Sequence, residues 1–422
     1  MSKFTFPTTR TALVLFGGLI ILLFAAALSG CGSDAPTMEP VTITFAHPPD
    51  AGEHYQALAD RFMQTHPEIT VELVPLSRGR FHIPDGVDAF SVGNQFTFAQ
   101  LRYQGDLLDL SPLIEQDAAF DYADFYPGTL DLFSGEGRVW GLPAGVDPLV
   151  LYYNKSLFAA AGLDVPANTW TWDDMLAAAL AVRNPENGDF GYAIFEQQLD
   201  LIAMVMIYQH GGRLVDDLDN PTQVTFNDPL NVEAMDWLQS LYHTHDVAPT
   251  REQANDAFGY GEQAIYRGVL GGKVGMWPGF FSERGGTDWP ADWSNLSWGM
   301  VALPQDAQAV TTGFAGGYAI SSTSLHPEAA WKWLTFLSEQ VPPDLVPARR
   351  SAAESREFSE RYGDEIAAAA RRSVETITLI SPNLVQFQTP LEAFSQAVQS
   401  IVDGNTTAQE ALDGAQKQAE VP

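Results

Sequence analysis

Cysteine is almost absent from this chain, because its 422 residues contain only one. A disulfide within one chain needs two cysteines and a thiolate metal cluster needs several, so neither can form. The single thiol, Cys31, lies near the N-terminus. The nucleophile-elbow sequence G-x-S-x-G is also missing. These absences argue against the familiar forms of nucleophilic catalysis, and no metal or cofactor is expected.

Basic residues are scarce too. The chain has 22 Lys and Arg against 53 Asp and Glu, which gives a net charge of −31. Nucleic-acid binding depends on clustered basic side chains, so this composition excludes it as the main function. The same balance disfavours an anionic small molecule and makes a neutral ligand the easier inference. The alternative is that the acidity only keeps the surface solvated.

The N-terminus reads as an export signal. Lys3 and Arg10 precede an uncharged run from Thr11 to Leu28, and Leu28-Ser29-Gly30-Cys31 follows the lipobox pattern. We expect residues 1–30 to be removed, Cys31 to carry the lipid, and residues 31–40 to form a flexible tether. Loss of Lys3 and Arg10 takes the net charge from −31 to −33. An uncleaved transmembrane helix is the alternative, since the apolar run is close to the shortest that spans a bilayer.

The rest of the chain is too long for one compact core, so two lobes are expected. Val41–His47 is strand-like, Tyr55–Thr65 has helical apolar spacing, and Ile69–Leu76 is strand-like again, with Pro67 between the last two. A strand, helix and strand in this order indicate a parallel sheet covered by helices.

The same grammar continues toward the C-terminus. Thr171 is a predicted helix N-cap, with Asp173 and Asp174 in the first turn. Further strands are predicted at Val87–Val92 and Val274–Trp277. Trp140–Asn154 holds a Gly/Pro-rich bend followed by an apolar strand and predicts a crossing between lobes, and the chain is expected to cross back near Trp298–Pro304. Tyr318–Ser321 would then help to complete the first lobe. Further helices are predicted at Phe98–Leu107, Trp172–Val182, Gln198–His210, Leu230–Tyr242, Pro327–Leu337, Leu391–Val402 and Thr407–Ala419.

Two motif-like stretches carry no function. Gly268–Lys273 is one residue short of a phosphate-binding loop and lacks a following Ser or Thr. His243-Thr244-His245-Asp246 places its two histidines two residues apart, where they do not share a helix face. A solvated helix end explains this second stretch better than a metal site does.

Several segments, in their order along the chain, resemble the extracellular solute-binding protein family that includes maltose-binding proteins. The most specific are ALADRFMQTHPEITVEL at 57–73, LYYNKSLFAAAGLDVPANTWTWDDML at 151–176, GGKVGMWPGFF at 271–281, PEAAWKWLTFLSE at 327–339 and DGNTTAQEALDGAQ at 403–416. The resemblance implies an α/β fold of the periplasmic-binding-protein type, with two α/β lobes joined by a hinge around an interlobe ligand cleft. It places residues 41–145 plus 304–338 in the N-terminal lobe and residues 146–303 plus 339–422 in the C-terminal lobe.

A sugar offers an apolar face and a rim of hydroxyls, so its site needs flat aromatic rings beside carboxylates and amides. Family resemblance and strand-end positions favour twelve ligand-binding residues, which are His47, Asp50, Glu53, Asn94, Gln95, Asp147, Gln198, Trp277, Phe281, Gly316, Gly317 and Tyr318. Trp277 and Phe281 are the expected aromatic platform. Arg349 resembles a recurrent family position. Leu391 stands where maltose-binding members have a tryptophan, so maltose itself is not predicted.

The resemblance implies that the chain is the substrate-binding lipoprotein of an ABC importer, which captures a sugar or oligosaccharide and delivers it to the permease. It would be a monomer tethered outside the cytoplasmic membrane through Cys31, and it would not be an enzyme. Within the same fold, the alternatives are a peptide, polyamine or glycerol phosphate ester as ligand, or a sensory receptor. A secreted lipid-anchored enzyme is the remaining alternative.

Overall fold

The computed structural model describes residues 40–77, 82–217, 221–286, 293–378 and 387–420. Contacts divide the chain into residues 1–41 and residues 42–422, and the account below concerns the second unit. The predicted signal, tether and Cys31 lie outside the described residues. Within the described residues, no helix combines the length and apolar character needed to cross a bilayer.

The main sheet of the described residues has nine strands, seven of them in the order β2-β1-β3-β10-β6-β8-β7, while β9 and β11 also pair with β6. The bounds are β1 (Val41–His47), β2 (Ile69–Pro75), β3 (Ala89–Val92), β6 (Leu142–Asn154), β7 (Phe190–Tyr192), β8 (Val274–Phe280), β9 (Trp298–Val301), β10 (Gly313–Ile320) and β11 (Val346–Pro347). A separate hairpin contains β4 (Ser134–Gly135) and β5 (Arg138–Val139).

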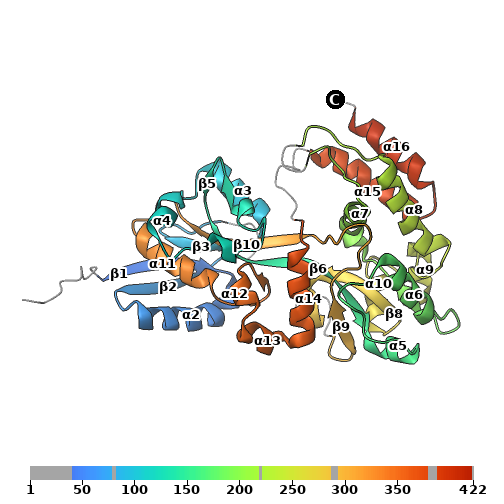
Figure 1. Ribbon diagram of the computed structural model, residues 1–422, viewed down its shortest axis with the longest axis horizontal. Coiled ribbons are helices and arrows are strands. Elements are labelled where there is room, and N and C mark those ends of the chain that lie inside the picture. Colours follow the sequence, from blue (N-terminus) through green and yellow to red (C-terminus); the bar gives the residue numbers. More distant parts are fainter. Residues whose placement is uncertain (1–39, 78–81, 218–220, 287–292, 379–386, 421–422) are drawn as a thin grey trace, which may run out of the picture. The chain divides into compact units, whose positions relative to one another are not determined.

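Strand β6 connects two groups of strands (Figure 1). Its first half is antiparallel to β10 and β11, and its second half is antiparallel to β8 and β9. All thirteen residues of β6 are buried except Asp147, which is partly exposed. A strand covered on both faces needs a nearly continuous apolar run, as Leu149 to Tyr153 provides. The partly exposed Asp147, in the middle of β6, therefore marks a point where the strand is not fully covered by neighbouring side chains.

Helices fill the connections between strands. The α-helices are α2 (Gly52–Thr65), α3 (Gln95–Gln104), α4 (Ser111–Gln116), α5 (Lys155–Ala160), α6 (Trp172–Val182), α7 (Leu199–Gln209), α8 (Pro229–His243), α9 (Arg251–Phe258), α10 (Ala264–Leu270), α11 (Pro327–Ser338), α12 (Arg350–Ala353), α13 (Arg356–Tyr362), α14 (Asp364–Glu375), α15 (Gln388–Val402) and α16 (Ala408–Ala419). The short 3-10 helices are η1 (Pro49–Ala51), η2 (Tyr122–Asp124), η3 (Asp131–Phe133), η4 (Glu196–Gln198) and η5 (Phe281–Gly286).

Local sequence explains where these helices begin. Thr171 forms a capping box with Asp174 at the start of α6, which confirms the predicted N-cap. Asn94 caps α3 by accepting hydrogen bonds from the backbone N–H groups of Phe96 and Thr97. Each cap satisfies helix donors that would otherwise lack a partner.

Apolar clusters hold the elements together. One joins β3, α3 and β10 through Phe90, Phe98 and Ala319. A second packs helices α6, α7, α8, α15 and α16 against β6. A third contains Tyr152, Trp277 and residues of α14. The C-terminal helices α15 and α16 lie beside α8 (Figure 1), so the end of the chain is part of the second cluster.

The predicted parallel opening is confirmed, since β1 and β3 pair in parallel. The antiparallel insertion of β10 between β3 and β6 was not predicted. The lobe boundaries stay a prediction. The segment after α11 pairs with the first half of β6 through β11, and the buried Arg349 joins Asp124 at 3.3 Å. These contacts connect residues 346–349 to elements assigned to the N-terminal lobe.

Candidate ligand-binding site

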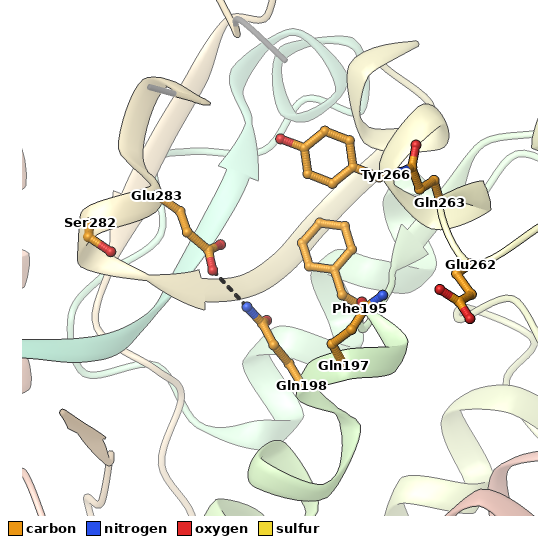
Figure 2. Close-up of a pocket in the computed structure, with 8 residues that line it drawn as sticks. All are labelled: Phe195, Gln197, Gln198, Glu262, Gln263, Tyr266, Ser282 and Glu283. Atoms are coloured by element: carbon orange, nitrogen blue, oxygen red, sulfur yellow. Dashed lines mark hydrogen bonds between the residues drawn. The ribbon is translucent and has the colours of Figure 1, made fainter. Parts of the chain in front are cut away.

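Three segments far apart in the sequence line a cavity of about 330 Å³. They are η4 with the residue before it, the start of α10 with the turn before it, and the start of η5 just after β8 (Figure 2). The lining residues are Phe195, Gln197, Gln198, Glu262, Gln263, Tyr266, Ser282 and Glu283.

The end of β8 brings Glu283 to this cavity. A Cβ on Gly279 would lie 2.6 Å from Oε2 of Glu283 and 3.0 Å from the ring of Tyr152. Only glycine leaves room for the carboxyl group to fold back over the strand. The glycine of the MWPGFF sequence therefore leaves room for a carboxylate.

A polar pair crosses the cavity floor. Nε2 of Gln198 donates a 2.8 Å hydrogen bond to Oε1 of Glu283 (Figure 2). Gln198 is 8% exposed, and its Oε1 has no hydrogen-bond partner in the part of the chain that the structure describes. A buried carbonyl oxygen without a partner costs about 1 to 3 kcal/mol. An acceptor without a partner therefore belongs to a residue that lines the cavity.

Two aromatic rings stand beside the polar pair. The rings of Phe195 and Tyr266 have centroids 5.4 Å apart and planes inclined by 34°. Nε1 of Trp293 donates a 3.1 Å hydrogen bond to the hydroxyl of Tyr266 and helps to fix that ring. Flat apolar surface next to hydrogen-bonding groups is the combination that a sugar needs.

A second carboxyl group, that of Asp147, contacts Ser282, the residue before Glu283. Asp147 of β6 accepts hydrogen bonds from the backbone N–H of Ser282 at 2.8 Å and from its hydroxyl at 2.7 Å. Burial raises the pKa of Asp147 to about 6, although the bonds from Ser282 and the charge of Arg284 act in the opposite direction. Burial, together with the charge of Asp147, raises the pKa of Glu283 to about 7. The cavity thus holds a carboxyl group that titrates near neutral pH.

This arrangement offers hydrogen-bonding groups and ring faces. Within the described residues, no group of three or more His, Cys, Asp or Glu side chains could hold a metal ion. His243 instead shares a hydrogen bond with the carbonyl of Val402 at 2.9 Å, in keeping with its interpretation as part of a helix end.

The structure brings two predicted residues to the cavity: Gln198 lines it and Asp147 supports Ser282 at its edge. The three residues after β1 lie elsewhere. His47 is buried, contacts the carbonyl of Pro48 at 2.8 Å and stacks on Tyr55, while Asp50 and Glu53 are exposed in η1 and the first turn of α2. A ligand role for these three stays a prediction.

Asn94 and Gln95 lie between β3 and α3. The side-chain oxygen of Asn94 is occupied by capping. Gln95 is fully buried, and its Oε1 accepts a 2.9 Å hydrogen bond from the N–H of Ala315. Nε2 of Gln95 has no partner in the described chain. Their ligand role is untested, and Gln95 has the donor to fulfil it.

The expected aromatic platform is buried. Trp277 and Phe281 have no exposed surface; Trp277 stacks on Tyr152, and Phe281 stacks on Phe358. Core packing accounts for both rings, so their complete burial counts against a platform role. That role stays a prediction.

Gly316, Gly317 and Tyr318 lie within β10. A Cβ on Gly317 would meet the ring of Phe133 at 2.5 Å and the carbonyl of Leu142 at 2.6 Å, so this glycine permits close sheet packing. Gly316 is nearly as crowded, with Leu345 at 3.0 Å. Tyr318 is buried beside Phe45. Ligand contact by these three residues also stays a prediction.

Sequence reasoning missed Phe195, Tyr266 and Glu283. Phe195 lies three residues before the predicted contact residue Gln198, and Glu283 lies two residues after the MWPGFF sequence, which contains the end of the predicted strand Val274–Trp277. Both therefore lay within reach of the same strand-end argument. Tyr266 gave no comparable signal, because its helix was not predicted.

Comparison with known proteins identifies the family. The model for "Bacterial extracellular solute-binding protein" matches residues 46–340. An uncharacterised lipoprotein of Streptomyces antibioticus is 26% identical over 78% of this chain and 72% of its own length. A mannitol-binding protein of Pseudomonas aeruginosa is 25% identical over 78% of this chain and 77% of its own length.

Among solved structures, an ABC substrate-binding protein of Listeria monocytogenes in complex with cycloalternan has a TM-score of 0.65 and 24% identity. The alignment covers 89% of this chain and 97% of that one, which supports the predicted two-lobed fold. With a family match across most of its length, the chain belongs to the bacterial extracellular solute-binding proteins, the solute-capturing components of ABC importers.

Proposed function

We propose that this protein captures a sugar or oligosaccharide in the cavity between η4, α10 and η5. The observation that carries the proposal is the buried Gln198, which has an unpartnered carbonyl oxygen and lines the same cavity as the rings of Phe195 and Tyr266. A sugar hydroxyl can donate to this oxygen while the apolar face of the ring rests on an aromatic plane. Gln197 and Gln263 offer further amides to the hydroxyl rim.

The named ligands of relatives agree with this proposal. The Pseudomonas aeruginosa relative is a mannitol-binding protein, and the Listeria monocytogenes structure holds cycloalternan. Both ligands are polyhydroxylated and uncharged. The two ligands therefore share a polyhydroxylated surface. The amides and aromatic rings of the cavity are suited to bind such a surface.

The proposal includes the whole capture cycle. Residues 41–145 plus 304–338 would form one lobe and residues 146–303 plus 339–422 the other, closing around the ligand by a hinge. Ligand contacts to both lobes would favour the closed form, which docks on the ABC permease. The protein would act as a monomer without catalysis, held at the outer face of the membrane by lipid on Cys31.

A thermal-shift screen against a panel of sugars and polyols tests the ligand class. A ligand that binds only the folded state raises the melting temperature with its concentration. The same screen on Gln198→Ala should lose most of the shift. A panel in which no saccharide or polyol changes the melting temperature, while a peptide or polyamine does, would overturn the proposal.

The anchor needs a separate test. The full-length wild type and Cys31→Ala are expressed in a bacterial host. For each protein, the distribution between membrane and soluble fractions and the mass are measured. The wild type should be membrane-bound and heavier than the cleaved polypeptide by the mass of its acyl groups. Equal solubility and unmodified mass for both proteins would remove the lipid anchor.

A further inference from the structure

The cavity has an unusual charge balance. Two of its eight lining residues are glutamates, Glu262 and Glu283, and none is Lys, Arg or His. A third acid, Asp147, is hydrogen-bonded to the lining residue Ser282. The binding surface is therefore negative, although the ligands of the relatives are neutral.

The guanidinium of the residue that follows Glu283 is already engaged. Arg284 donates to the carbonyls of Phe281 and Pro343, pairs with Asp344 at 3.3 Å and lies over the ring of Tyr362 at 4.4 Å. Its charge acts on Asp147. Glu283 has no cation within salt-bridge distance in the described part of the chain, and its hydrogen-bonding side chain is the neutral amide of Gln198.

The two polar atoms of the Gln198 amide differ in their hydrogen bonding. Its amide nitrogen is used by Glu283, so its carbonyl oxygen is the atom left without a partner. Gln198 and Glu283 consequently place two acceptors near each other: the unpartnered Oε1 of Gln198, and a carboxylate that already accepts from Gln198 and from the backbone of Phe280. Figure 2 shows these two side chains meeting beside the rings of Phe195 and Tyr266.

From this arrangement we infer that the ligand is an amino sugar, or an oligosaccharide containing one, whose protonated amine binds between Glu283 and Oε1 of Gln198. The inference rests on the proposed function and names the substrate class of the same site.

An ammonium group fits better than a hydroxyl for three reasons. It has three donors, whereas a hydroxyl has one, so it can bind Gln198 and Glu283 together. Its hydrogen bonds to a carboxylate are charge-assisted and roughly twice as strong as neutral ones. A cation is also attracted to the faces of the Phe195 and Tyr266 rings.

Burial of Glu283 adds a pH dependence. Its pKa is raised to about 7 by burial and by Asp147, so part of the protein carries a protonated Glu283 at neutral pH. The titratable and charged groups around it are Asp147 and Tyr152 of β6, Glu262 and Tyr266 near α10, and Arg284 of η5. A bound ammonium favours the ionised carboxylate, and so amine binding should release protons near pH 7.

The test is isothermal titration calorimetry on full-length protein with matched pairs of sugars. Each pair shares one ring configuration, gluco, galacto or manno, and differs only in an amine or a hydroxyl at carbon 2; N-acetylated forms and short oligomers extend the set. For at least one configuration the amine should bind about tenfold tighter or more at pH 7. Titration in buffers of different ionisation enthalpy should reveal proton release for the amine alone.

Two variants give matched controls. Glu283→Gln keeps an acceptor for Gln198 but removes the charge, so the amine should bind within about twofold of its hydroxyl partner. Glu186→Gln removes an exposed charge outside the cavity lining and should leave the preference within about twofold of wild type. Circular dichroism checks that both variants fold.

The outcomes separate the two ideas. Hydroxyl sugars binding as tightly as their amines would overturn the amino-sugar inference and leave sugar capture intact. Amine preference that survives in Glu283→Gln, or proton exchange absent from the wild type, would overturn the role of Glu283. Failure of every saccharide to bind would overturn the proposed function, and the inference would fall with it.

Discussion

Two groups of aromatic side chains lie close together but differ in exposure: one is buried, and the other lines a cavity. Tyr152, Trp277 and Trp293 form a sealed group in which Trp277 stacks on Tyr152 and meets Trp293 edge-on at 5.6 Å. Phe195 and Tyr266 line a cavity instead. A hydrogen bond from Trp293 to Tyr266 links the two groups. Residue type therefore does not distinguish support from binding, whereas access to open space does.

The largest effect is expected for Trp277→Ala, which tests whether the sealed group supports the fold. Loss of a fully buried indole should lower the free energy of unfolding by about 3 to 5 kcal/mol. Chemical denaturation measures this change. A variant of unaltered stability that no longer binds ligand would show instead that Trp277 is the platform originally predicted from the sequence.

The carboxyl group next to the cavity should make stability depend on pH. Glu283 has a pKa raised from 4.5 to about 7, so the folded state holds its proton more tightly than the unfolded state does. Stability from this group is full below about pH 4.5 and is lost as pH rises through 7. Glu283→Gln cannot titrate and should exceed the wild type by about 3 kcal/mol at pH 8.

The two proteins should be nearly equal in stability near pH 4, where the wild-type carboxyl is neutral. Urea denaturation across this pH range makes the comparison. Asp147, with a pKa of about 6, adds a slope of the same sign that both proteins share. Parallel curves with no divergence above pH 6 would contradict the assignment to Glu283.

Tyr266→Ala tests the cavity side of the comparison. Removing this partly exposed ring should weaken binding of the cognate sugar about tenfold, with a smaller stability loss than Trp277→Ala. Tyr266→Phe keeps the ring and should keep most of the affinity. Tyr103→Ala removes a ring that is 94% exposed and outside the cavity, so it should bind normally. Equal weakening by Tyr266→Ala and Tyr103→Ala would refute the role of the ring.

The smallest expected effect concerns Asn94, which caps α3. Asn94→Ala should cost about 1 kcal/mol of stability, and Asn94→Ser should restore most of it because serine also caps. Thermal melts measure both. If affinity falls in both variants while Asn94→Ser regains stability, Asn94 touches the ligand as the sequence predicted.

Much of the fold could be predicted because its signals are local. The capping box at Thr171 and the apolar run of β6 each need only a few neighbouring residues to be recognised. Strand pairing is not local. Ser91 pairs with Tyr318, and no sequence signal near either residue predicts its partner. The antiparallel place of β10 was missed for that reason.

The site was harder to predict than the fold. Gln198 and Asp147 were chosen because they match contact regions of the family. Trp277 and Phe281 were chosen as the aromatic platform, whereas Phe195 and Tyr266 were not considered. Which ring is exposed depends on what covers it, and Trp277 is covered by side chains from β6 and by Trp293. Burial of this kind emerges only from three-dimensional packing.

The long separation between β3 and β10 has a consequence for synthesis. A chain leaving the ribosome cannot complete the sheet until residues 313–320 have been made, because β10 lies between β3 and β6. Pairings between distant segments also slow folding, since a long loop must close first. A nascent chain with this topology stays open for longer, and that delay suits a polypeptide that has to thread through a secretion pore before it folds.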